Sequence, residues 1–355
     1  MKSSRKYWEK RTLQGFLDML EHGELLHKRL GEHFAEAQSN IEKEVAHLYS
    51  KHARDNAISP ERATELIKGQ EYRRWRTGME DYLQALAVHN DKALMLELNT
   101  LCMRPRINRL EALEGEILAQ MAVLANVEDK DIGQHLKNVL EDTYYRTMYQ
   151  HYRYKNPALL KLMQTHSVAL SKANIEAVLT YPWSGRNYSQ NIWNREHQIS
   201  RTIRSTVSRN ILEGKSIENL TAEMANTFGD DYENQARRLI HTETAFFKGQ
   251  GDLMTYEKLE VGKYEYLATL DGKTSEVCQD LDGQVFRVED ARPGKNYPPM
   301  HPHCRSTTVA YFEDRERDGT RVARGTDGKT YKVPEGLKYH EWRAKYGPPT
   351  ERARG

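Results

Sequence analysis

The spacing of apolar residues in the first part of the chain restricts its fold more than any other feature of the sequence. Between about residues 9 and 155, apolar side chains recur at steps of three and four, as in the run Leu30, Phe34, Ala37, Ile41, Val45 and Leu48. That period matches one face of an α-helix. We therefore expect long amphipathic helices that pack on one another or on another chain. A regular coiled coil is the alternative, but glycines interrupt the pattern, and each costs about 1 kcal/mol in a helix interior.

The composition and periodicity of the sequence change twice after this helical part. Pro, Gly, Ser and Asn concentrate in residues 180–189 and predict a boundary, and helical periodicity then continues to about residue 259. From Tyr264 onward, short β-prone runs alternate with Asp-Gly turns, and beyond Phe312 the chain is polar and rich in turn residues. The sequence thus predicts a mostly α, α+β protein. It divides into an elongated helical domain at 1–180, a small mixed α+β module at 181–312 and an extended polar tail at 313–355.

Charge, cysteine content and hydropathy exclude several classes of protein. The 53 Lys and Arg residues against 51 Asp and Glu residues leave a net charge of +2, so no global field attracts nucleic acid. Three cysteines are too few for a secreted disulfide scaffold and favour a reducing compartment. No apolar run approaches the roughly 20 residues of a membrane-spanning helix, and the first residues lack the apolar core of a signal peptide.

Local basic surface remains as a possible contact for DNA. Arginines recur on two expected helices, at Arg201, Arg204, Arg209, Arg237 and Arg238. Such a row can face phosphates. A solvated helix face is the alternative that the same pattern allows.

The stretch 268–306 concentrates the residues that are able to do chemistry. Cys278 and Cys304 lie 26 residues apart, and His301 and His303 stand beside Cys304, just after Pro298-Pro299. Two thiolates and one or both imidazoles can form a zinc site. Neither cysteine belongs to a Cys-x-x-Cys pair, so a fourth ligand is unaccounted for. The alternative is a pair of packed, reduced thiols that holds the turn against the first strand, with a histidine bonded to backbone. A disulfide requires an oxidising environment.

Acidic residues near this stretch permit a second interpretation. The carboxylates of Asp271, Glu276, Asp280 and Asp282 could bind the metal of a nuclease. Asp-Gly pairs more commonly form turns, so we expect solvated turn residues.

The preceding helix carries His241-Thr242-Glu243, which could offer a base beside a hydroxyl. We expect Thr242 and Glu243 to pack or cap instead. The sequence contains no phosphate-binding glycine loop, nucleophile elbow or His-Glu-x-x-His helix.

The order of these residues carries a family resemblance. The ordered string comprises Thr242, Glu243, Asp271, Cys278, Leu281, Asp282, Gly283, Phe286, Pro298, Pro299, His301, Pro302, Cys304 and Arg305. It resembles the phage Mu protein F-like family of minor head, or head morphogenesis, proteins, most clearly over about 190–312. Val333-Pro334, Leu337, Tyr339 and Trp342 are similar to the ends of family members from phages of Gram-positive bacteria.

The resemblance implies a structural protein and not an enzyme. Such a protein is present in a few copies inside the phage head, is associated with the portal, and is needed for head assembly or DNA ejection. The implied partners are the portal protein and, beyond it, scaffold, major capsid protein and packaged DNA, with no membrane contact during assembly and no small-molecule substrate. It is expected in the virion near the portal, and in the host cytoplasm during assembly.

This sequence departs from the family pattern at two positions. Many relatives have Cys-x-x-Cys and Cys-x-Cys, whereas here Ser275 precedes Cys278 and Ser306 follows Cys304. A four-thiolate zinc site cannot form, so the resemblance implies no cofactor, apart from a structural zinc that would need His301 or His303. A metal-dependent hydrolase or toxin-like effector on the same module, and a helical adaptor, are the alternative functions.

Overall fold

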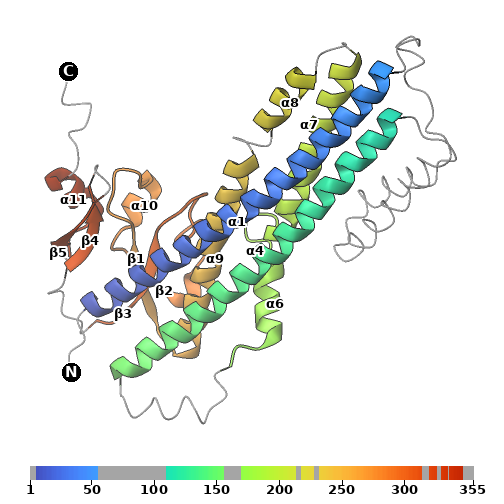
Figure 1. The fold of residues 1–355 in the computed structure, drawn as a ribbon. Coiled ribbons are helices and arrows are strands. Elements are labelled where there is room, and N and C mark those ends of the chain that lie inside the picture. Colours follow the sequence, from blue (N-terminus) through green and yellow to red (C-terminus); the bar gives the residue numbers. More distant parts are fainter. Residues whose placement is uncertain are drawn as a thin grey trace. The chain divides into compact units, whose positions relative to one another are not determined.

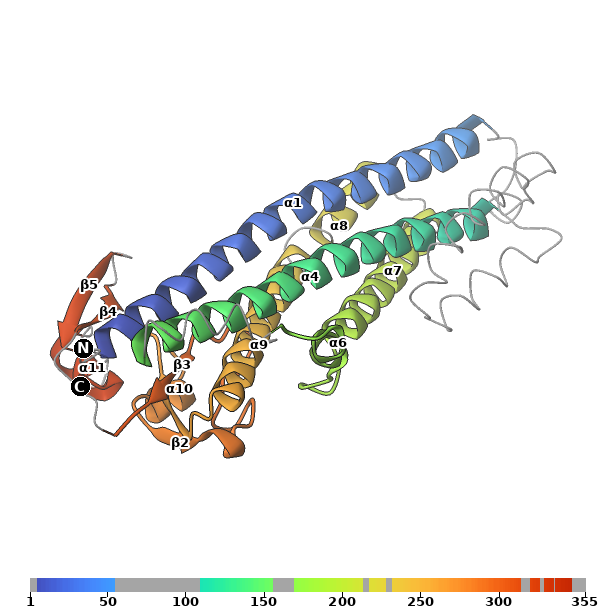
Figure 2. The same ribbon diagram turned by 90° about the horizontal axis from the view of Figure 1, so that it is seen from below.

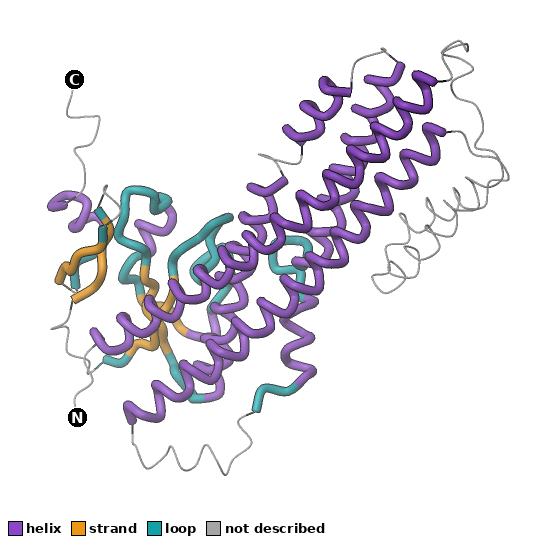
Figure 3. Tube along the Cα trace, in the orientation of Figure 1, coloured by secondary structure: helices purple, strands orange, loops and turns teal. Residues whose placement is uncertain are grey.

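The computed structural model describes residues 5–54, 109–155, 169–212, 217–227, 232–313, 320–325, 329–334 and 336–346 (Figure 1). Its helices are α1 (Arg5–Arg54), α4 (Arg109–Lys155), α6 (Lys172–Thr180), α7 (Tyr188–Leu212), α8 (Ile217–Asn226), α9 (Asn234–Lys258), α10 (Glu276–Leu281) and α11 (Tyr339–Tyr346). Its strands are β1 (Lys263–Leu267), β2 (Val285–Arg287), β3 (Thr307–Tyr311), β4 (Thr320–Arg324) and β5 (Thr330–Pro334). Helices dominate the described ranges (Figure 3), so the expected mostly α, α+β fold is confirmed.

The apolar period of the N-terminal part gives the helices that it predicts. In α1, Leu30, Phe34 and Ile41 are each at most 2% exposed, as the spacing requires. The side chain of Leu48 lies outside the described part of the chain. In α4, Ile117 and Met121 are equally buried. α1 therefore stabilises the fold through one apolar stripe, whereas α4 is buried on more than one face, since Leu118 and Ala119 are buried as well.

The chain divides into two compact units, and each is built from separate segments. Unit 1 comprises Met1–Glu24, Gln134–Trp183 and Arg238–Gly355, whereas unit 2 comprises Leu25–Gly133 and Ser184–Arg237. This division differs from the sequence boundaries at 180 and 312. The physical reason is that α1, α4 and α9 each contribute residues to both units, so no single cut separates a helical arm from the module.

Unit 2 has a buried ionic cluster within its helical core. The Arg195 guanidinium contacts the carboxylates of Glu128 and Glu196, and the Tyr232 hydroxyl donates to Glu196 Oε1 at 2.6 Å. Burial raises the pKa of Glu196 to about 8, although the positive charge of Arg195 opposes that change. The ring of Tyr232 also packs edge-on against Phe34, with 4.4 Å between centroids. These contacts fix α7 against α1 and α4 inside the unit.

Unit 1 packs a three-stranded antiparallel sheet beside α9. The strand order is β2-β1-β3, and Tyr264 of β1 lies opposite Phe286 of β2 and Ala310 of β3. Figures 1 and 2 both show the C-terminal half of α9 beside this sheet. Tyr256 of α9 packs with Tyr264 and Tyr297 in one buried cluster. This cluster joins α9 to the sheet, because Tyr264 belongs to β1.

A glycine sets the distance between α9 and α4 within unit 1. A Cβ atom at Gly251 would lie 2.8 Å from Thr143 Cβ and 2.9 Å from the Leu140 carbonyl oxygen. Thr255, one turn later, donates its hydroxyl hydrogen bond toward the carbonyls of Tyr144 and Gly251. The close approach of the two helices therefore depends on the missing side chain.

The expectation of an extended tail is corrected by the structure. β4 and β5 form an antiparallel pair with Val322 opposite Lys332, and α11 follows them. The apolar members of this segment pack around Leu270 of the module, and they are Ala323, Val333, Tyr339 and Trp342. The hairpin could not be predicted from the polar composition of this segment, because a few apolar residues at the right positions are enough to bury one of its faces.

Candidate functional site

The loop elements of unit 1 bring the chemistry-bearing residues of the stretch 268–306 together. Ser275 stands at the N-terminus of α10, which presents Cys278 on its buried face. On the other side, the segment after β2 turns at Pro298-Pro299, whose peptide bond is cis, and at His303, which has a φ of 58°. This turn returns the chain to β3 and places Cys304 opposite α10.

Cys278, His301 and Cys304 form a close group. Their ligand atoms all lie within 4.8 Å of one another. The Sγ atoms of Cys278 and Cys304 are 3.8 Å apart, and Cys278 Sγ lies 3.3 Å from Nε2 of His301. Both sulfurs are buried and are not joined in a disulfide. The contact between the two cysteines that the sequence predicts is therefore present.

The hydrogen bonds of His301 determine which ring nitrogen faces the sulfurs. Nδ1 lies 2.8 Å from the carbonyl oxygen of Pro302. A carbonyl oxygen can only accept, so Nδ1 carries the proton and Nε2 of the neutral ring has a free lone pair. That lone pair points at Cys278 Sγ and at the hydroxyl of Ser275, which lies 2.8 Å from Nε2.

The two thiols differ strongly in acidity because one donates to the other. The hydrogen bond to Cys304, together with burial, raises the pKa of Cys278. The same bond from Cys278 lowers the pKa of Cys304 to about 6, against the effect of burial and with help from the backbone amides of Met300 and Ser306. Tyr266 of β1 also donates its hydroxyl hydrogen to Cys278 Sγ at 3.2 Å. The contact thus favours a state in which the two sulfurs share one proton.

His303 does not join this group. Its side chain is exposed, its backbone N–H donates to Thr242 Oγ1 at 3.1 Å, and its ring lies edge-on to His241 with 5.6 Å between centroids. The structure therefore assembles three of the four residues that the sequence offers as metal ligands.

The acidic residues serve as structural acceptors or lie at the surface. Asp271 accepts from the Arg305 guanidinium, from the Lys273 backbone at 2.9 Å and from Thr274. Burial alone would raise the pKa of Asp271, but the contact with Arg305 and the hydrogen bonds from Lys273 and Thr274 together outweigh it, and the net change is a lowered pKa. Glu276 is exposed on α10.

Asp282 is bonded as extensively as Asp271. It accepts from Arg321, from the backbone N–H of Ala268 and from the backbone N–H of Tyr339, each between 2.8 and 2.9 Å. Asp280 nearby is exposed and contacts only His340 in the described contacts, at 3.1 Å. The four acids do not converge on a common point, in contrast to the arrangement that a carboxylate-bound metal requires.

Thr242 and Glu243 link α9 to neighbouring segments. The Thr242 hydroxyl donates to the Arg238 carbonyl one turn earlier and accepts from His303. Glu243 is 2% exposed and accepts a hydrogen bond from Trp183 Nε1 at 3.1 Å. Burial raises the pKa of Glu243 to about 7, and the bond from Trp183 only partly offsets it. The expected packing role is consistent with these contacts.

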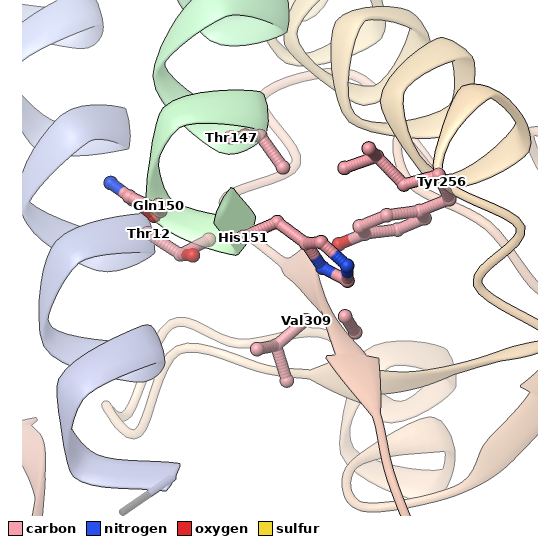
Figure 4. Close-up of a pocket in the computed structure, with 8 residues that line it drawn as sticks. Thr12, Thr147, Gln150, His151, Tyr256 and Val309 are labelled. Atoms are coloured by element: carbon pink, nitrogen blue, oxygen red, sulfur yellow. The ribbon is translucent and has the colours of Figure 1, made fainter. Parts of the chain in front are cut away.

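A small cavity lies beside β3 within unit 1 (Figure 4). It is lined by Thr12, Thr147, Gln150, His151, Tyr256, Leu259, Val309 and Ala310. Its volume of about 10 Å³ leaves room for one water molecule. It is therefore a packing feature and is too small for a substrate.

The arginine row is partly neutralised inside unit 2. Arg204 lies 3.3 Å from Glu114, and Arg209 lies 2.7 Å from Glu223. Arg201 is exposed. Paired arginines contribute less to a phosphate-binding face than the sequence pattern alone indicates.

Sequence reasoning missed three polar neighbours of the site. Ser275, Tyr266 and Trp183 contact His301, Cys278 and Glu243 respectively. Only Ser275 carried a usable signal, as the residue three positions before Cys278. The other two contacts depend on how distant segments fold together.

Fold and site together define a mostly helical protein whose small α+β module closes around a Cys-His-Cys group. Residues 201–309 of the chain match the family model described as Phage Mu protein F like protein, and this confirms the resemblance seen in the ordered motif. These residues form a phage Mu protein F-like region, which indicates a phage head morphogenesis protein with a place in the virion. No curated protein and no solved structure matches the chain. Within the described ranges, no helix has a stretch long and apolar enough to cross a membrane.

Proposed function

We propose that this protein is a minor head protein of a phage that associates with the portal and acts in head morphogenesis by binding other head components. The observation that carries the proposal is the family match over residues 201–309. The same role extends to DNA ejection, since a protein held near the portal lies where DNA leaves the head.

The contacts of the motif acids support binding rather than catalysis. Asp271 and Asp282 are the two aspartates of the ordered motif, and both are engaged with arginines and backbone amides that hold the module together. A hydrolytic centre needs carboxylates that are free to bind a metal or to move a proton. We therefore assign these motif residues to folding of the module and treat the protein as a non-enzyme.

The portal protein is the first partner in this proposal. Scaffold and major capsid protein are further candidates, because a protein that is enclosed during assembly meets both. Packaged DNA is a weaker candidate, since Arg204 and Arg209 already have acidic partners. The protein would reach the head interior from the host cytoplasm, with no membrane contact and no small-molecule substrate.

The test uses the full-length protein and the portal protein of the same phage. We expect the two purified proteins to sediment together, and a phage that lacks this gene to give few infectious particles until the gene is supplied in trans. Infectious particles formed at normal yield without the protein, together with no association with the portal, would overturn the proposal.

A parallel assay addresses the metal-dependent hydrolase. The protein is incubated with DNA or RNA and divalent cations, beside a His301→Gln variant. We expect no cleavage by either protein. Cleavage by the wild type that His301→Gln abolishes would replace the binding role with an enzymatic one.

A further inference from the structure

We propose that Cys278, His301 and Cys304 bind one zinc ion in unit 1, with the fourth coordination position left to a solvent molecule. This inference does not depend on the head morphogenesis role, because it rests on the geometry of three side chains. Among the described residues, these three side chains each offer one ligand atom to a metal ion.

The distances between the ligand atoms agree with the edges of a zinc tetrahedron. With Zn–S bonds of about 2.3 Å and tetrahedral angles, two thiolates lie about 3.8 Å apart. With a Zn–N bond of about 2.0–2.1 Å, a sulfur and a nitrogen lie about 3.6 Å apart. The observed separations are 3.8 Å between the sulfurs and 3.3 Å between Cys278 Sγ and His301 Nε2. These two edges match within a few tenths of an ångström, and the third, between Cys304 Sγ and the ligand nitrogen of His301, is at most 4.8 Å.

The neighbours of the three ligands orient them as metal ligands are oriented. The bond from His301 Nδ1 to the Pro302 carbonyl fixes the tautomer that leaves Nε2 free, which is the usual arrangement for a zinc-bound imidazole. Backbone amides of Met300 and Ser306 donate toward Cys304, and Tyr266 donates to Cys278, so both sulfurs receive the bonds that stabilise thiolates.

The chemistry of the donors selects the metal. Two thiolates and an imidazole are soft to intermediate ligands, which favour Zn²⁺ over Mg²⁺, Ca²⁺ or Mn²⁺. A doubly charged cation also neutralises the two thiolates, so the buried pair can lose both protons on binding. A packed pair of thiols accounts for the sulfur contact, but it does not require a third donor atom, His301 Nε2, within 3.3 Å of Cys278 Sγ.

The first experiment measures zinc in the full-length protein, purified under reducing conditions without chelators. We expect about one zinc per chain by mass spectrometry of the metal. Cys278→Ser, Cys304→Ser and His301→Gln should each lower the zinc content at least about fivefold, because each removes a first ligand. Two matched controls, Cys102→Ser and His303→Gln, should retain it. Cys102 lies outside the described residues, and His303 lies outside the group.

The second experiment increases the number of ligands. Ser275 Oγ lies 2.8 Å from His301 Nε2, so Ser275→Cys would place a third sulfur at the open coordination position. We expect it to tighten zinc binding roughly tenfold or more, measured by competition with a chromophoric chelator. A zinc affinity unchanged by Ser275→Cys would contradict an open coordination position on the side of Ser275.

Cobalt supplies a readout that does not depend on the folding of the variants. Co²⁺ added to the reduced wild-type protein should give a thiolate-to-cobalt charge-transfer band and the strong visible bands of tetrahedral cobalt. A wild-type protein that binds neither zinc nor cobalt while both thiols titrate as free would overturn the proposal. Oxidised cysteines, or zinc content unchanged in Cys278→Ser and Cys304→Ser, would overturn it as well.

Discussion

Arg321 and Asp282 form a two-pronged ion pair in the interior of unit 1. Nη1 of Arg321 lies 2.8 Å from Oδ2 of Asp282, and Nη2 lies 2.9 Å from Oδ1. Both side chains are at most 4% exposed. Arg321 also donates to the Ala268 carbonyl at 2.7 Å, and the Tyr339 backbone donates to Asp282. One carboxylate therefore joins the turn after α10 to β4 and to the start of α11.

Removing the charge of Asp282 should destabilise the protein strongly. Asp282→Asn leaves the Arg321 guanidinium buried without a counter-charge, which costs about 3–5 kcal/mol. Urea denaturation followed by circular dichroism measures the loss. Asp280→Asn is the matched control, because Asp280 is 71% exposed and its pair with His340 contributes little. Equal stabilities of the two variants would show that the buried pair does not hold the tail segment.

The stability of the protein should fall as Glu243 ionises. Burial raises the pKa of Glu243 from 4.5 to about 7, so the folded state binds this proton more tightly than the unfolded state. Its contribution is complete below pH 4.5 and is lost as the pH rises through 7.

Glu243→Gln isolates this effect, since the amide oxygen can still accept from Trp183. We expect equal stabilities of the two proteins below pH 4.5, where Glu243 is neutral in both states. Above pH 7, the variant should be more stable by up to about 3 kcal/mol. Chemical denaturation at a series of pH values measures the difference, and a constant difference across the series would contradict the assignment.

Two Gly→Ala substitutions in helices should change the stability of the protein in opposite directions. Gly251→Ala places a methyl group 2.8 Å from Thr143 Cβ, and the resulting overpacking costs about 1–3 kcal/mol. Gly31→Ala meets no atom within 4 Å, so it should stabilise α1 by up to about 1 kcal/mol through helix propensity. Thermal unfolding of both variants tests the pair, and a neutral Gly251→Ala would mean that α9 and α4 are farther apart than described.

The tail segment should contribute to the stability of the module. Trp342 is 2% exposed and packs with Leu270, Ala323, Val333 and Tyr339. Trp342→Ala should cost about 3–5 kcal/mol, because it empties a large part of that cluster. Tyr346→Ala is the control, since Tyr346 is 42% exposed. Limited proteolysis should then cleave the Trp342→Ala variant faster after residue 313, and equal rates would indicate an independent tail.

The sequence predicts the helices well because their signal is local. The period that buries Leu30 and Ile41 is contained in α1 itself. The division into units could not be predicted in the same way, because α1 and α4 run through both units without a break in composition. Periodicity shows which face of a helix is apolar, but it does not show which segment covers that face.

The candidate site was predictable where the ordered motif fixes it and unpredictable where distant segments meet. The motif placed Cys278, His301 and Cys304 in one turn-rich stretch, and the structure brings them together. The bond from Trp183 to Glu243 spans 60 residues and has no sequence signal. The tail segment is polar in overall composition, but its apolar residues Val333, Tyr339 and Trp342 are those that pack on the module.

Unit 1 is built from three segments that are far apart in the sequence, and this affects how it folds during synthesis. Its core joins Met1–Glu24 with Gln134–Trp183 and Arg238–Gly355, so the first of these segments cannot complete the core until the other two have left the ribosome. Met19 near the start contacts Thr143, and Thr143 in turn packs against Gly251. Folding of this core is therefore completed only after β3 and the segments that follow it have been synthesised. A premature stop codon anywhere before β3 yields a polypeptide in which the core of unit 1 is incomplete, and nonsense alleles of this kind should behave as complete losses of the gene.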